Sequence, residues 1–376
     1  MHERLAADFA RFGESLPTDW PACVRERYRI DLTAEYLGVS LPHPIGKGSG
    51  QLSLRLDQLE TDAEAGLAFV VLKTVVGEDA EGRRTMGAWA VHETRMAVER
   101  RTFEGREGWT VTWRGRGWDR PFAEYLQLVR GARALTRGTG MLTIPSVKLH
   151  LPPAGAPFAS GEYARTIGDL AEAWGPEPLL VEKDFSPTLA GNALADERVS
   201  VLRWIEEVPA LIRVSAPRGA RVALKLMNAR FDDAFQREML AAAAHSADAV
   251  TVFNRLWDAE RQVAYGGWEL SGRNLRVLKS APVAIPRSGT GNVESGRMIV
   301  EYARRGCTSV QLHTGFQLPL REYPASAGSR TARTLHRLVF HPETGLIAAL
   351  LELEAAGALV RRDGELRFLD LARGAS

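Results

Sequence analysis

The chain has few of the features that would tie it to an oxidising compartment or to a metal. Its 376 residues contain two cysteines, Cys23 and Cys307, which lie far apart and form no C-x-x-C pair. A disulfide framework, a cysteine zinc site and an iron–sulfur cluster on this chain are therefore not expected. We expect no bound metal and a reducing, cytoplasmic location.

Long apolar runs and a strong charge of one sign are also missing. No run of 18 or more apolar residues occurs, so we expect neither a membrane-spanning segment nor export of the chain. The formal net charge is only +2, so no overall field draws the chain to nucleic acid or to anionic membranes. Leu5, Phe9, Phe12 and Leu16 form a narrow apolar stripe among acidic residues, which favours a small capping helix over a membrane-surface helix.

What the chain does have is a regular alternation of strand-like and helix-like segments from about Ile30 onward. Apolar runs of this kind suit parallel strands that are buried on both faces. The expected strands lie near residues 43, 70, 145, 180, 223, 251, 284 and 310. Eight βα units predict an α/β fold of the (β/α)8 TIM-barrel type over residues 1–335. An open doubly wound sheet is the alternative, because a strand count does not show closure.

Two segments depart from the alternation. Around residues 100–118, Trp109 to Trp113 alternate as in a strand and have arginines on both sides. We interpret this segment as a hairpin inserted over the barrel mouth and expect no nucleic-acid partner, although an aromatic, basic surface is the alternative. Residues 336–376 predict a helix and a β-hairpin, either a small extension or subunit contact or, alternatively, a winged-helix end.

The stretch from Ala284 to Gly315 has the pattern of strand, glycine turn, helix, strand and second turn. The two turns are Ser288–Asn292 and His313–Gly315. Turns that leave neighbouring parallel strands direct several backbone N–H groups at one point, which is a way to hold phosphate. In TIM barrels such a site usually follows strands seven and eight.

Polar side chains, several of them lysines, stand where the apolar strands stop. They are Ser49, Lys73, Lys148, Lys183, Ser186, Lys225 and Asn254. A single lysine here is equally well explained as a rim residue with its stem on apolar surface. Lys73 and Lys225 together, beside a phosphate site, favour an anionic ligand or a cofactor that gains negative charge.

These segments resemble the dihydroorotate dehydrogenase family of FMN-dependent barrels over roughly residues 31–316. Residues 41–50 resemble the family's first strand and its Ala-Ser-Gly turn. Residues 72–74 (Leu-Lys-Thr) resemble its Thr-Lys-Ser/Thr turn, and residues 185–188 (Phe-Ser-Pro-Thr) its Ser-Cys/Ser-Pro-Asn turn. Residues 223–226 (Ala-Leu-Lys-Leu) match its Val-Lys-Leu strand.

The second half of the resemblance covers the strand-end asparagine and the glycine pairs. Asn254 falls on the family's substrate-binding asparagine, and residues 266–267 and 271–272 resemble its Gly-Gly and Ser-Gly pairs near the flavin. Residues 288–293 and 310–315 resemble its two phosphate turns. The resemblance implies an FMN site formed by Gly48, Ser49, Lys73, Lys225, Gly266, Gly267, Gly289, Thr290, Gly291, Asn292, His313, Thr314 and Gly315.

The same resemblance implies the chemistry. Ser186 takes the position of the catalytic base, and Lys73 stabilises negative charge on the flavin. The reaction moves a hydride between flavin N5 and a C–C bond next to a carbonyl, with an unidentified external electron acceptor or donor. The family is homodimeric, which we expect here too. A plain turn cap before Pro187 is the alternative role of Ser186.

Departures from the family concern the substrate. Lys183 and Thr188 stand where the family has asparagines, so Lys183, Thr188 and Asn254 are the expected substrate residues. A lysine only donates, so we expect a cyclic amide or a specialised-metabolism substrate and not dihydroorotate. Asn292 and His313 replace glycines of the phosphate turns. Alternatives are a non-redox barrel enzyme that acts on a phosphorylated small molecule, and a flavin-binding regulatory protein.

Overall fold

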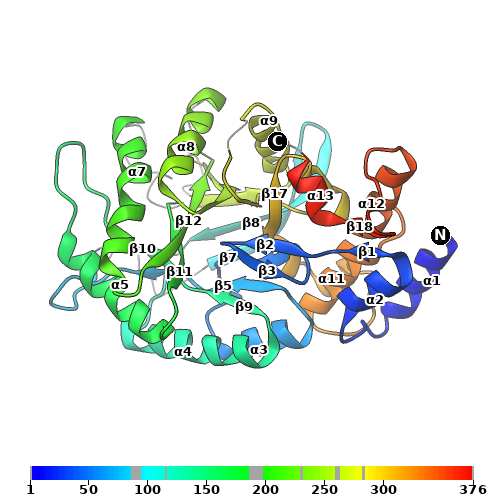
Figure 1. The fold of residues 1–376 in the computed structure, drawn as a ribbon, viewed down its shortest axis with the longest axis horizontal. Coiled ribbons are helices and arrows are strands. Elements are labelled where there is room, and N and C mark those ends of the chain that lie inside the picture. The colour runs from blue at the N-terminus through cyan, green and yellow to red at the C-terminus, as the bar shows by residue number, and fades with distance from the viewer. Residues whose placement is uncertain are drawn as a thin grey trace.

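The computed structural model describes residues 2–85, 95–114, 117–185, 198–228, 232–258, 263–281 and 284–374. At its centre is a ten-stranded sheet in which all neighbouring strands are parallel, in the order β6-β10-β11-β12-β13-β16-β17-β4-β5-β9. The sheet curls, with helices along its outer side (Figure 1). This arrangement is consistent with a TIM-like barrel.

The strands of this sheet are short and almost entirely buried, as predicted for parallel strands covered on both faces. They are β4 (Ile45–Lys47), β5 (Phe69–Val71), β6 (Val75–Val76), β9 (Leu142–Ile144), β10 (Ser146–Lys148), β11 (Leu179–Asp184), β12 (Ala220–Met227), β13 (Ala249–Asn254), β16 (Arg287–Gly289) and β17 (Cys307–Leu312). Most lie within a few residues of the predicted positions.

Amphipathic helices follow the strands and bury one side against them. They are α3 (Leu56–Glu64), α4 (Phe122–Thr139), α5 (Ser160–Trp174), α7 (Arg198–Ser215), α8 (Asp233–Ser246), α9 (Leu270–Lys279), α10 (Gly296–Ala303) and α11 (Arg330–Phe340). In α7, Trp204, Val208 and Ile212 recur every four residues, and all three are fully buried. This spacing places the three side chains on one face of the helix.

Two boundaries of the sequence prediction were wrong. The strand expected near residue 284 is β16, so Ser288 and Gly289 belong to a strand and the turn starts at Thr290. The strand expected near residue 43 is divided. Residues Val39–Leu41 form β3, which pairs antiparallel with β2 (Ala34–Tyr36), and the parallel strand β4 begins only at Ile45. Prolines at positions 42 and 44 separate the two, since proline donates no ladder hydrogen bond.

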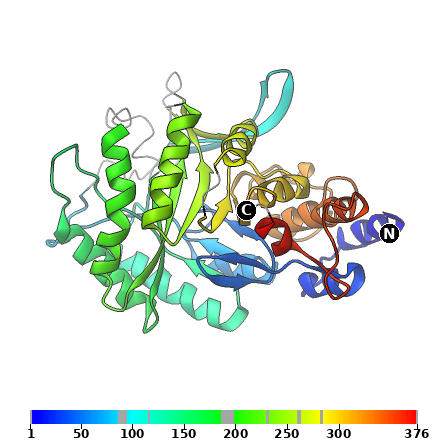
Figure 2. The ribbon, with the colours of Figure 1, turned by 45° about the horizontal axis from the view of Figure 1, so that its top comes forward.

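The inserted hairpin is present as β7 (Arg95–Phe103) and β8 (Arg106–Arg114), and it projects from the body (cyan in Figure 2). It belongs to a four-stranded sheet, β14-β15-β8-β7, with β14 (Leu256–Asp258) and β15 (Val263–Gly267). Gly266 and Gly267 of β15 pair with Val111 and Thr110 of β8. The next helix, α9, starts at Leu270.

The N-terminal and C-terminal segments of the chain pack against each other at one side of the molecule (Figure 1). The N-terminal part forms α1 (His2–Phe12), α2 (Trp20–Tyr28) and β1 (Ile30–Asp31), and the C-terminal part forms α12 (Leu346–Ala355), β18 (Leu366–Arg367) and α13 (Phe368–Arg373). A capping helix at the N-terminus is thus confirmed.

The C-terminal β-hairpin was wrongly predicted. Residues 358–360 form no strand, and β18 pairs in parallel with β1 instead. Arg25 of α2 holds Glu365 through two donor nitrogens at 2.8–3.1 Å, which fixes the residue before β18 against the N-terminal part. Helix α11 also runs across the expected boundary between residues 335 and 336. None of the described helices is long and apolar enough to cross a membrane.

Candidate functional site

The structure brings the two predicted turns to one place at the carboxyl ends of β16 and β17. Both turns line a single hollow that encloses about 410 Å³ of empty space, counting the part open to solvent. Its lining consists of Asn254, Arg255, Gly266, Thr290, Gly291, Asn292, Val293, Gln311, Leu312, His313, Thr314 and Gly315. Ligands of parallel α/β folds bind at this edge of the sheet.

The first turn depends on glycine. Gly291 has φ +100°, and a Cβ atom there would overlap the side-chain amide of Asn274. That amide donates to the carbonyl of Thr290 at 2.7 Å. Tyr302 donates to the same carbonyl at 2.7 Å, and its ring occupies the space a Cβ at Gly289 would need. The buried side chains of Asn274 and Tyr302 therefore hold the turn in place through the Thr290 carbonyl.

Asn292 and His313 replace glycines of the family pattern, and each fits for a different reason. Asn292 adopts φ +58°, a left-handed conformation that asparagine tolerates better than most residues. The His313 ring packs where a Cβ of Gly50 would lie. Burial, followed by the charge of Arg255, lowers its pKa well below the usual range, so His313 is neutral and adds no counter-charge.

The second turn is a short 3-10 helix, η3 (Thr314–Phe316). The carbonyl of Gly315 accepts hydrogen bonds from Tyr323 at 2.7 Å and Thr334 at 2.9 Å. Within the described ranges, the backbone N–H groups of Gly291, Asn292, Thr314 and Gly315 donate to no acceptor of the chain. Unpaired N–H groups that line a hollow need an external acceptor, and an anion provides one.

Lysines from neighbouring strand ends stand beside this hollow. Lys73 is 7% exposed, and burial, with the nearby charges of Arg255 and Lys148, lowers its pKa to about 7. No ion pair to Lys73 is formed by the residues the structure describes. Lys225 is buried, with its Nζ 3.5 Å from Oε1 of Glu182. A negative charge placed next to Lys73 would raise its pKa and keep it protonated.

Glu182 is the fully buried carboxylate beneath these lysines. Its Oε2 accepts hydrogen bonds from Tyr36 at 2.8 Å, Thr251 at 3.0 Å and Gln311 at 2.9 Å. One oxygen of Glu182 in β11 thus accepts hydrogen bonds from side chains of β2, β13 and β17. Among the described residues Oε1 has no hydrogen-bond partner, and it lies 3.5 Å from Nζ of Lys225, so Glu182 and Lys225 form a charged pair inside the sheet.

Sequence reasoning missed Asp184, which the structure places in the site. Its Oδ2 lies 3.4 Å from Nζ of Lys148 and also 3.4 Å from the hydroxyl of Thr74. The Thr74 hydroxyl continues to Ser49 at 2.8 Å and to Ser146 at 3.0 Å. This buried network joins the ends of four strands, and it includes Ser49 and the residue after Lys73.

Lys183 lies on the opposite face of β11 from Asp184. Successive strand residues alternate between faces, so Glu182 and Asp184 point inward and Lys183 points to the helix layer. Its Nζ donates to the carbonyl of Asp184 at 3.1 Å. Burial, followed by the charge of Lys148, lowers its pKa to about 7, and the charges of Asp184 and then Glu162 of α5 oppose this shift. Period-two alternation was the available signal for Asp184, and motif spacing led us to Lys183 instead.

The remaining predicted site residues are distributed as follows. Asn254 ends β13 and lines the hollow, and Gly267 lies in β15 beside Gly266. Gly48 donates its N–H to Leu312 at 2.9 Å, and a Cβ there would sit 3.5 Å from Gln311, so alanine would fit. Ser186 and Thr188 lie outside the described residues.

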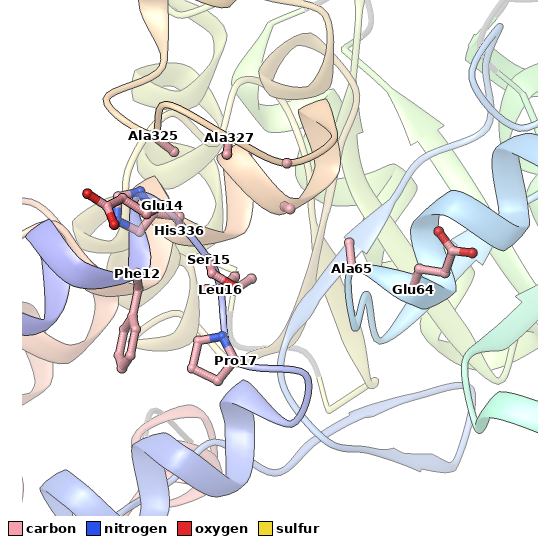
Figure 3. A pocket seen from close by; sticks show the side chains of 12 residues that line it. Phe12, Glu14, Ser15, Leu16, Pro17, Glu64, Ala65, Ala325, Ala327 and His336 are labelled. Atoms are coloured by element: carbon pink, nitrogen blue, oxygen red, sulfur yellow. The ribbon is translucent and has the colours of Figure 1, made fainter.

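A second hollow lies between the N-terminal cap, the end of α3 and α11 (Figure 3). Its lining contains Glu14 and Glu64 and no lysine or arginine, and burial lowers the pKa of its one histidine, His336. It therefore does not suit an anion, and it adjoins the amino end of β5, away from the strand-end lysines.

The site thus combines unpaired N–H groups with an excess of buried cations, which suits a phosphorylated or otherwise anionic ligand. Across the described ranges, no cluster of three or more His, Cys, Asp or Glu side chains is arranged to hold a metal ion. Searches against protein-family models and against curated proteins found no match to this chain.

Proposed function

We propose that this protein is an FMN-dependent oxidoreductase of the dihydroorotate dehydrogenase type. The observation that carries the proposal is the convergence of two N–H-rich turns with Lys73 and Lys225 at one edge of a parallel sheet. The turns suit the phosphate of FMN, and the lysines suit a ring system that becomes negatively charged on reduction.

The proposed scaffold is a closed (β/α)8 barrel, supported by the pairing at the two ends of the sheet. β5 and β6 are consecutive pieces of chain, as are β9 and β10. β5 pairs with β9, and β6 pairs with β10, at opposite ends of the strand order. Counting each couple as one interrupted strand gives eight strands, in which the last pairs with the first.

Bound FMN would supply hydride acceptance or donation at its N5 atom. In this proposal Lys73 stabilises negative charge on the ring, and its lowered pKa returns toward the ordinary value as that charge develops. Ser186 remains the proposed proton acceptor or donor at the carbon next to the carbonyl. The hydrogen-bond network of Asp184, Thr74 and Ser49 would hold its own side chains in place around the flavin ring.

Asp184 and Lys148 sharpen the proposed substrate class. A carboxylate accepts and an ammonium donates, so the pair complements an edge that carries one N–H and one C=O. A cyclic amide presents both. We therefore keep the cyclic amide as the proposed substrate and assign its recognition to Asp184, Lys148 and Asn254 instead of Lys183.

The absorbance spectrum of the purified protein tests the proposal. We expect absorbance maxima at the wavelengths typical of a flavin, release of FMN on denaturation, and bleaching of the flavin absorbance by a cyclic amide substrate under anaerobic conditions. Protein that is colourless and takes up no added FMN would contradict the proposal. Dihydroorotate is included as a reductant, because its ring also presents N–H and C=O groups.

The unpaired N–H groups also support a second candidate, a non-redox barrel enzyme that acts on a phosphorylated small molecule. Turnover of a sugar phosphate by flavin-free protein would favour it. A flavin-binding regulatory protein is distinguished by Ser186→Ala, which would leave every property of such a protein unchanged and would abolish turnover in the proposed enzyme. Gel filtration tests the predicted homodimer.

A further inference from the structure

Lys47 and Asp62 form a buried ion pair that has no part in the proposed chemistry. Nζ of Lys47, at the end of β4, lies 2.5 Å from Oδ1 of Asp62 in α3, and the two side chains are 4% and 1% exposed. The hydroxyl of Thr331, in the first turn of α11, donates to the same carboxylate oxygen at 2.6 Å. A strand and two helices are therefore joined at one point between the sheet and its helix layer.

This pair lies directly against the second turn of the hollow. Nζ of Lys47 is over the ring of Phe316, the last residue of η3, and 4.8 Å from the ring centre. In the pairing of β4 with β17, Lys47 stands opposite Leu312, the residue before His313. After burial and the charge of Arg255, the charge of Lys47 is the next to lower the pKa of His313. Lys47 thus contacts the end of the turn and adjoins its beginning.

Helix α11 holds the same turn by a second route. Thr334 donates to the carbonyl of Gly315 at 2.9 Å. Thr331 and Thr334 are three residues apart, so they share one face of the helix. Between these two attachments the turn carries the unpaired N–H groups of Thr314 and Gly315. The direction of these groups is therefore set jointly by Thr334 and by the pair of Lys47 with Asp62.

Net stability alone does not explain an ion pair at this place. Desolvation of two buried charges offsets most of their attraction, and apolar residues of similar volume are often as stabilising. Both donors to Asp62 share Oδ1, and its Oδ2 has no hydrogen-bond partner among the described residues. What the pair adds is a fixed position. An ammonium held by a carboxylate and by the face of an aromatic ring has little freedom to shift.

We infer that Lys47 and Asp62 are positioning residues of the phosphate site, which fix η3 so that the N–H groups of Thr314 and Gly315 converge on the phosphate of the ligand. The inference rests on the proposed function in that FMN supplies this phosphate. Riboflavin lacks the phosphate and keeps the ring, so the pair should act on FMN and leave riboflavin unaffected.

The test is a titration of flavin-free protein with FMN and with riboflavin, followed by quenching of flavin fluorescence. In Lys47→Met/Asp62→Leu both charges are replaced by apolar side chains, so the melting temperature should stay closer to wild type than in either single variant. The FMN Kd of the double variant should still rise about 10-fold, as for one weakened hydrogen bond to a charged group. Its riboflavin Kd should change less than about twofold.

Two further variants separate positioning from general destabilisation. Phe316→Leu keeps the ion pair and removes the ring beneath Lys47, so it should show the same split between the two flavins. Arg27→Met is the matched control, because it removes a partner of the buried carboxylate of Asp8 in the N-terminal cap, at 2.6 Å. It should lower the melting temperature and change neither Kd.

Wild-type FMN affinity in the double variant or in Phe316→Leu overturns the inference, and so does equal weakening of FMN and riboflavin. If wild type binds neither flavin, the proposed function fails, and calorimetry with inorganic phosphate then decides the role of the pair. Weaker phosphate binding by Lys47→Met/Asp62→Leu than by wild type supports the inference. Equal binding by the two proteins, or no phosphate binding by wild type, overturns it.

Discussion

The buried pair of Glu182 and Lys225 provides the sharpest test of how this site is held. Both side chains are at most 4% exposed, and Glu182 also accepts three hydrogen bonds from neutral donors. Lys225→Met removes the only described cation within 4 Å of that carboxylate and leaves its charge buried. Losing one partner of a buried ion pair costs about 3–5 kcal/mol, whereas replacing both is often close to neutral.

We therefore expect Lys225→Met to lower the free energy of unfolding by about 3–5 kcal/mol. Glu182→Gln should lower it by less, because a glutamine oxygen can still accept from the three neutral donors. The double variant should recover at least about 2 kcal/mol relative to the sum of the single variants. Urea unfolding of the flavin-free protein, followed by circular dichroism, measures all four proteins. Additivity within about 0.5 kcal/mol would refute the coupling and leave Lys225 as an independent rim residue.

Three further predictions follow from the site. Gly291→Ala should abolish FMN binding and destabilise the fold by about 1–3 kcal/mol, because its φ is positive and Asn274 fills the space, whereas Gly48→Ala should be tolerated in the same binding and melting assays. Burial lowers the pKa of Lys73 to about 7, so the unfolded chain binds this proton more tightly than the folded protein does. Flavin-free protein should therefore gain stability from about pH 7 to 10. In melting temperatures measured over this pH range, Lys73→Met should show a smaller gain. Lys183→Met should leave the FMN Kd unchanged and raise the melting temperature at pH 6, and a variant that loses FMN would show that Lys183 faces the ligand. Asp184→Asn should reduce turnover with any substrate that bleaches the flavin.

The sequence was sufficient where local chemistry decides the structure. Apolar runs predicted the parallel strands, and Gly291 predicted the turn after β16, because a side chain at this position would meet Asn274. It was insufficient where distant segments pair. Gly266 and Gly267 of β15 pair with β8, and β18 pairs with β1. Neither partner is within reach of a local pattern.

Lys183 was predicted to face the substrate, whereas the alternation of β11 places it on the opposite face from Glu182 and Asp184. This difference comes from a local pattern and not from a distant pairing. The motif Phe185–Thr188 set the register by spacing, which is sensitive to a single missing residue between strand and turn. The face of a strand is fixed by alternation, and Glu182 reveals it, because a carboxylate so deeply buried must face the polar side chains of other strands. Counting two residues on from Glu182 leads to Asp184. Asp184 is paired with Lys148, so in the proposed site the ligand meets a carboxylate and an ammonium instead of a lone lysine. A lone lysine suits a ligand edge with acceptors only, whereas this pair suits an edge with one donor and one acceptor, as in an amide.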